Sequence, residues 1–164
     1  MTGTLGIYYD MWGDGETGPP ARSRNPRHLY QRAVWFKSNP RSASAMKQLF
    51  HETWPDGRFV DVSKNKGWRR EAADCETVVL LYPDAIGLGF GAIERQVLRN
   101  RARNNRARVL NGRKRDFLLT PSARRGLRLR RMLERTMAGE LLFGFVFLVA
   151  TPLMLSFDLV RGRR

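Results

Sequence analysis

A long apolar segment near the C-terminus, Leu141 to Val160, constrains this chain more than any other feature. Leu141 to Phe157 carries no formal charge, and Glu140 and Asp158 border it. An α-helix needs about 20 apolar residues to cross the ~30 Å hydrocarbon core of a bilayer. The alternative is a buried helix of a soluble protein, but LLFGFVFLVA is apolar on every face and a chain of 164 residues can hardly cover it. We therefore predict a membrane protein.

The flanks and the centre of this segment leave two geometries open. Arginines precede it at six positions, which are Arg124, Arg125, Arg128, Arg130, Arg131 and Arg135. The positive-inside rule then places the N-terminal side in the cytoplasm, although the tail from Arg161 to Arg164 is basic too. Thr151-Pro152 lies mid-segment, and proline removes a helical hydrogen bond. The segment is either a straight or kinked span, or a re-entrant helix–break–helix that returns both basic flanks to the cytoplasm.

The net charge of +15 is concentrated in a basic collar. Residues 1–100 carry 14 Lys and Arg against 11 Asp and Glu, whereas residues 101–135 carry 13 against Asp116 and Glu134. Nucleic-acid binding is an alternative for such a collar, but residues 101–116 contain no aromatic side chain and no known motif. The position directly before an apolar segment favours anionic lipid head groups as partners of the six arginines.

A single cysteine, Cys75, excludes an internal disulfide framework and fits a reducing compartment. The first ten residues lack the apolar core of a secretory signal. We expect the N-terminal domain in the cytoplasm, and another membrane protein as a further partner of the chain.

The first part of the chain predicts a small α/β domain. Strands are expected at residues 5–9, 58–62, 77–82 and 108–110, with 116–119 as the hairpin partner of the last after the turn residues Asn111 and Gly112. Helices are expected at residues 28–36, 42–50, with Ser42 as its cap, and about 92–101. Such alternation predicts a mainly parallel sheet. Pro121 behind Thr120 then starts a basic amphipathic helix. The predicted parts are a cytoplasmic domain, a basic juxtamembrane helix, a membrane segment and a basic tail, at residues 1–119, 120–137, 138–160 and 161–164.

Asp10 and Asp84 each end a predicted strand at its carboxyl end, where open parallel sheets bind ligands. The glycines that follow Asp84, at Gly87, Gly89 and Gly91, offer backbone N–H groups for a phosphate. Their spacing is not the dinucleotide fingerprint. The alternatives are a structural turn and two carboxylates that simply end strands. No metal site, cofactor or complete catalytic set is identified.

Residues 124–160 resemble the membrane-inserting segment of bacterial polyprenyl-phosphate glycosyl-1-phosphate transferases, which move a sugar phosphate onto a lipid carrier. The resemblance rests on Arg131 to Arg135, two apolar halves and the Thr151-Pro152 break between them. It implies a re-entrant segment, a bacterial inner membrane and a cell-envelope polysaccharide pathway. That family has Ser at the break, and its catalytic domain with an Asp-Glu pair has no counterpart here, so no catalytic residue is carried over.

Three functions are expected from these features. The preferred one is a membrane-anchored accessory or regulatory subunit of a lipid-linked glycan pathway. The second is an anchored transferase that uses a nucleotide-sugar at Asp10, Asp84 and the glycine loop, and the third is a structural single-span subunit of a larger membrane complex. Whether the chain is an enzyme stays open at this point.

Overall fold

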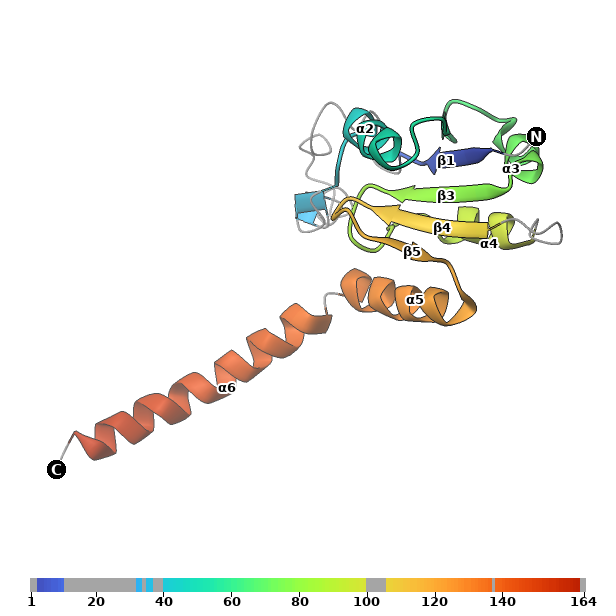
Figure 1. The fold of residues 1–164 in the computed structure, drawn as a ribbon. Coiled ribbons are helices and arrows are strands. Elements are labelled where there is room, and N and C mark those ends of the chain that lie inside the picture. Colours follow the sequence, from blue (N-terminus) through green and yellow to red (C-terminus); the bar gives the residue numbers. More distant parts are fainter. Residues whose placement is uncertain are drawn as a thin grey trace. The chain divides into compact units, whose positions relative to one another are not determined.

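The computed structural model consists of two compact units, residues 1–127 and 128–164. The first unit is a small α/β domain, as the sequence predicts (Figure 1). The second contains the end of one helix and a long apolar helix. The structure describes residues 3–10, 32–33, 35–36, 40–99, 106–136 and 138–162.

A five-stranded sheet forms the centre of the first unit, in the order β2-β1-β3-β4-β5. Its strands are β1 (Thr4–Tyr8), β2 (Arg58–Asp61), β3 (Thr77–Tyr82), β4 (Arg106–Asn111) and β5 (Asp116–Leu118). The first four are parallel, and β5 pairs antiparallel with β4. The prediction of a mainly parallel sheet that ends in a hairpin is therefore confirmed. The strand order reverses between β1 and β3, which is where open α/β sheets place their ligands.

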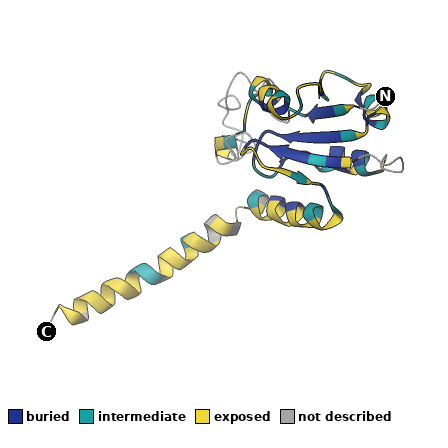
Figure 2. Cartoon of the chain, in the orientation of Figure 1, coloured by how far each residue is buried: buried dark blue, intermediate teal, exposed yellow. Residues whose placement is uncertain are grey.

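Helices cover both faces of this sheet. They are α2 (Ala43–Thr53), α3 (Trp68–Asp74), α4 (Gly91–Arg99) and, up to Leu127, α5 (Pro121–Thr136). Successive residues of a strand point to opposite faces. Accordingly Val79 and Leu81 of β3 pack in one core with Phe50 of α2, whereas Val78 and Leu80 pack in another with residues of α3, α4 and α5. Burial on both faces explains the uninterrupted apolar run of β3 (Figure 2).

The starts of two helices agree with the sequence. The backbone N–H of Ala45 donates to Ser42 Oγ at 3.3 Å, and that of Ala123 donates to Thr120 Oγ1 at 3.1 Å. These hydroxyls satisfy N–H groups that have no partner within their helices. The first unit extends to Leu127, eight residues beyond the predicted boundary, because the side chain of Leu127 belongs to the core of the domain.

Helix α3 is an element that the sequence did not predict. It has seven residues, no side-chain cap, and only Trp68 and Ala72 buried. Two apolar residues one turn apart are too few to reveal a helical period. The helix predicted at residues 28–36 lies largely outside the described residues.

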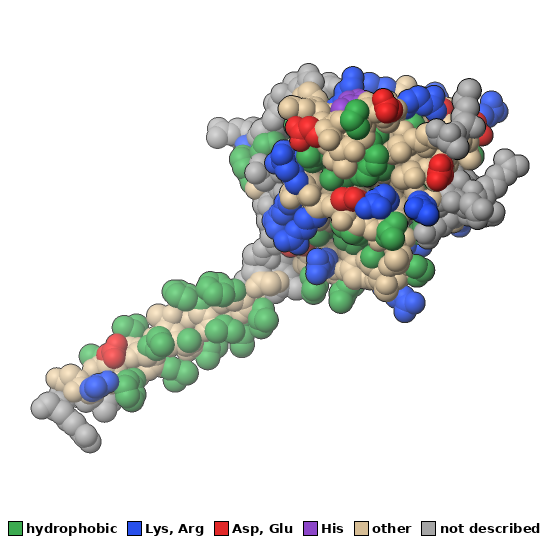
Figure 3. All heavy atoms as spheres, viewed as in Figure 1, with side chains coloured by type: hydrophobic (Ala, Val, Ile, Leu, Met, Phe, Trp, Pro, Cys, Tyr) green, Lys and Arg blue, Asp and Glu red, His purple; other side chains and the backbone are tan. Residues whose placement is uncertain are grey.

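The second unit contains α6 (Ala138–Arg161), whose 24 residues span about 36 Å. The helix continues through Pro152 without a break. Its stretch from Leu142 to Leu159 is long and apolar enough to cross a membrane, and none of it is buried. Figure 3 shows hydrophobic side chains along its length. The hydroxyl of Thr151 donates to the carbonyl of Phe147 at 2.7 Å, so this polar group is satisfied within the helix.

Candidate functional site

The loop between β3 and α4 is held together by the carboxylate of Asp84. This side chain is 3% exposed and accepts hydrogen bonds from the backbone N–H groups of Ile86, at 2.8 Å, of Gly87, and of Leu88, at 3.0 Å. The N–H groups of Gly87 and Leu88 would be needed as phosphate donors, but they are engaged by a negative charge of the loop itself. This geometry favours the structural turn over a phosphate cradle.

Two of the three glycines in this loop have a backbone that other residues rarely adopt. The φ angle is 67° at Gly87 and 85° at Gly89, both in the left-handed region. A Cβ atom at Gly87 would lie 2.5 Å from Cδ2 of Tyr82. Gly91 is the first residue of α4. The glycine spacing therefore reflects a tight reversal of the chain against a buried aromatic ring.

Asn111, the last residue of β4, braces the same loop from the neighbouring strand. Its side-chain amide donates to the carbonyl of Ala85 at 3.0 Å, and its Oδ1 accepts from the backbone N–H groups of Arg113 and Arg115. Sequence reasoning identified Asn111 only as a turn residue. Its position at the carboxyl end of a predicted strand was the one signal in the sequence for this wider role, and it was not used.

A buried polar group connects β3, α4 and α5 within the first unit. Glu94 is fully buried, and its Oε1 accepts a hydrogen bond from the hydroxyl of Tyr82. The Nε of Arg124 lies 3.8 Å from Glu94 Oε2, and the Arg124 side chain is 19% exposed. Arg124 is thus an internal partner of Glu94, in addition to being one of the arginines predicted to contact lipid.

Asp10 lies two residues beyond the end of β1, beside the carboxyl end of β2. The phenol of Tyr8 is buried under α2, and its pKa is raised by that burial and, to a smaller extent, by the carboxylates of Asp10 and Asp61. Asp61 accepts hydrogen bonds from the backbone and the hydroxyl of Ser63. Asp61, which sequence reasoning did not select, is paired with Tyr8 in the register of β1 and β2, while Asp84 serves its own loop.

Among the described residues, no group of three or more His, Cys, Asp or Glu side chains is arranged to hold a metal ion. No protein family, curated protein or solved structure matches this chain. The chemistry of its own side chains is therefore the basis for a functional proposal. The two features that this chemistry offers are the apolar helix α6, which is long enough to cross a membrane, and the arginines that precede it.

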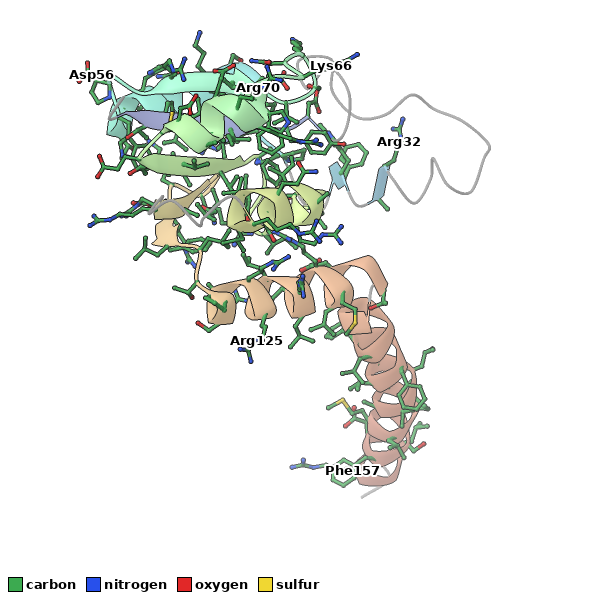
Figure 4. The ribbon with its side chains drawn as sticks, turned by 90° about the vertical axis from the view of Figure 1, so that its right-hand side faces the viewer. Arg32, Asp56, Lys66, Arg70, Arg125 and Phe157 are labelled. Carbon is green, nitrogen blue, oxygen red and sulfur yellow. The ribbon has the colours of Figure 1, made fainter. Side chains whose placement is uncertain are left out.

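The arginines of α5 differ in their exposure. Arg124 is half-buried beside Glu94, and Arg131 is buried. The side chain of Arg135 lies outside the described part of the chain. Figure 4 shows Arg125 on the side of α5 away from the sheet. The predicted lipid-contacting residues that are exposed are Arg125, Arg128 and Arg130.

Proposed function

We propose that this chain is a membrane-anchored accessory or regulatory subunit whose α/β domain is held at the cytoplasmic face of a bacterial inner membrane. The observation that carries the proposal is α6, an apolar helix of 24 residues with none of its stretch from Leu142 to Leu159 buried. Leaving such a surface in water is unfavourable, because each Å² of apolar surface costs about 25 cal/mol. A bilayer removes this surface from water.

The charges on either side of α6 support the orientation. Arginines are more numerous before the apolar stretch, where α5 carries six, than after it, where Arg161, Arg163 and Arg164 follow. Positively charged flanks stay preferentially in the cytoplasm. The larger number of arginines on the N-terminal side therefore supports a cytoplasmic domain.

An accessory role is supported by the state of the predicted crevice. The carboxylate of Asp84 and the N–H groups of Gly87 and Leu88 bond to one another. A catalytic acid or base needs to reach the reacting group of a substrate. The groups of this loop instead stiffen the carboxyl edge of the sheet, which suits a surface that binds a partner protein.

The pathway is a narrower proposal, and it rests on the resemblance of residues 124–160 alone. A lipid-linked glycan pathway would place the partner enzyme and its substrate in the same membrane. The continuous helix through Pro152 fits a span better than the re-entrant form that the resemblance implies. The chain is therefore an accessory protein that α6 anchors as a membrane span of its own.

Two experiments test this proposal. In intact cells, a Gly162→Cys variant should react with a membrane-impermeant maleimide from outside, whereas a Lys47→Cys variant should react only after lysis. The buried Cys75 is replaced by Ala in both variants. Cells that lack the chain should lose surface polysaccharide. The full chain, or the domain on an unrelated membrane helix, should restore it, and residues 1–137 alone should not. Unchanged polysaccharide in cells without the chain would refute the pathway, and an unreactive residue 162 would refute the span.

A further inference from the structure

The exposed face of α5 carries a stripe of large apolar side chains. Leu129, Met132 and Leu133 are 55%, 56% and 47% exposed. Their spacing of three and four residues, continued by exposed Thr136, places them on one side of the helix. Leu127 and Arg131 are buried, and the helical period places them on the opposite side. The helix therefore presents large apolar side chains outward as well as inward.

Exposed arginines border this stripe. At roughly 100° per residue, Arg128 falls on one side of the stripe and Arg130 on the other, with Arg125 one turn ahead of Leu129. Arginines in such positions can extend their alkyl chains along apolar surface and hold the guanidinium groups at a polar boundary. A helix with an apolar face between rows of arginines matches the boundary between lipid head groups and acyl chains.

We propose that the C-terminal half of α5 lies in the plane of the membrane surface, with Leu129, Met132 and Leu133 among the acyl chains and Arg125, Arg128 and Arg130 on anionic phospholipid head groups. This inference rests on the proposed insertion of α6. It limits the predicted contacts with lipid head groups to three of the six arginines. It also adds a contact between apolar side chains and acyl chains, which the charge of the helix alone does not predict. The partner is the bilayer itself.

The short connection between α5 and α6 favours lipid over a separate protein as the partner that covers the stripe. Helix α5 ends at Thr136 and α6 begins at Ala138. Seven helical residues from Leu129 to Thr136 and two further residues span at most about 18 Å. The stripe is thus tethered next to the point where α6 would enter the bilayer. Arginines near an anionic surface add electrostatic attraction to this tether.

The depth of α5 in a bilayer tests this inference. The full chain, with Cys75→Ala and a nitroxide on Met132→Cys, is reconstituted into vesicles of phosphatidylglycerol and phosphatidylethanolamine. Accessibility to oxygen and to a water-soluble nickel chelate then reports the depth of the label. We expect residue 132 to lie about 5–10 Å into the boundary between head groups and acyl chains. A label on Lys47→Cys, exposed on α2, should stay in water.

A charge-matched pair of variants tests the role of the arginines. Changing Arg125, Arg128 and Arg130 to Gln should move the label on residue 132 toward water. Changing Lys66, Arg70 and Arg113 to Gln removes the same charge from exposed positions of the domain outside α5 and should leave the label where it is. Figure 4 shows Lys66 and Arg70 on the domain.

A further label on Leu148→Cys separates the two proposals. If residue 148 is inside the bilayer and residue 132 is as accessible to the chelate as residue 47, the surface position of α5 is refuted and the anchor stands. If residue 148 is also in water, both are refuted. If the label on residue 132 is shielded from both reagents, the stripe is covered by a protein partner instead of lipid. If its spectrum is broadened by the label of another copy of the chain, the stripe is covered by a second copy.

Discussion

Arg124 provides the sharpest test of how the basic helix is attached to the domain. We predict that Arg124→Met lowers the free energy of unfolding by about 3–5 kcal/mol, because it leaves the carboxylate of Glu94 buried without the nearby guanidinium. The distance of 3.8 Å between Arg124 Nε and Glu94 Oε2 gives the same magnitude. Two unit charges at that separation attract by about 4 kcal/mol at an effective dielectric constant of about 20. Methionine keeps most of the apolar stem of the arginine.

Urea unfolding of the full chain in detergent micelles measures this loss, with the fluorescence of buried Trp68 as the signal. Arg125→Met is the matched control, since Arg125 is the exposed neighbour on the same turn, and it should change stability by no more than about 0.5 kcal/mol. Combining Glu94→Gln with Arg124→Met removes both charges. The double variant should be about 2–3 kcal/mol more stable than the sum of the single effects indicates.

Either of two results would refute this reasoning. A loss below about 1 kcal/mol for Arg124→Met would mean that water screens the pair as it does at a surface. Strict additivity in the double variant would mean that Glu94 and Arg124 act independently. In both cases the attachment of α5 would rest on packing, to which Leu127 contributes as a member of the core, and not on this ion pair.

Three further predictions concern the domain. In the same urea titration, Gly87→Ala should lower the free energy of unfolding by about 2–3 kcal/mol, because it combines a left-handed backbone with a contact of 2.5 Å to the ring of Tyr82. Gly126→Ala, with nothing within 4 Å of the added Cβ, should raise the free energy of unfolding by about 0.5–1 kcal/mol. Asp84→Ala should cost about 2–3 kcal/mol and speed hydrogen exchange in the loop that follows it; unchanged exchange would contradict its role as the acceptor of that loop. Because the pKa of Tyr8 is raised, the folded chain keeps the phenol proton above pH 10.0, where the unfolded chain loses it. Stability should therefore fall as the pH rises beyond 10.0, and Tyr8→Phe should make the fall of stability with pH less steep.

Much of the fold was predictable because it depends on local pattern. The continuous apolar run of β3 indicated a strand buried on both faces, and Ser42 and Thr120 indicated the starts of α2 and α5. The hairpin of β4 and β5 followed from the turn residues at Asn111 and Gly112. Helix α3 was missed, because two buried residues in one short helix leave no period to detect.

The candidate site was less predictable, because the role of a polar side chain depends on what surrounds it in space. Asp84 and the glycines look the same in sequence whether they hold a phosphate or close a turn. Only the folded loop shows that the carboxylate bonds to the backbone of Gly87 and Leu88. Asp61 was not selected at all, because nothing in the sequence shows that the register of β1 and β2 places it opposite Tyr8.

The sequence by itself determined that the chain has an apolar segment long enough to cross a bilayer, since length and composition alone set the cost of leaving such a helix in water. It also determined that arginines crowd the approach to that segment. The tertiary structure decided which of them are available. Arg124 is drawn to the buried Glu94, thirty residues earlier in the chain, while Arg125, Arg128 and Arg130 stay exposed. Burial of an unpaired charge is costly, and pairs of this kind form only when folding brings distant elements together.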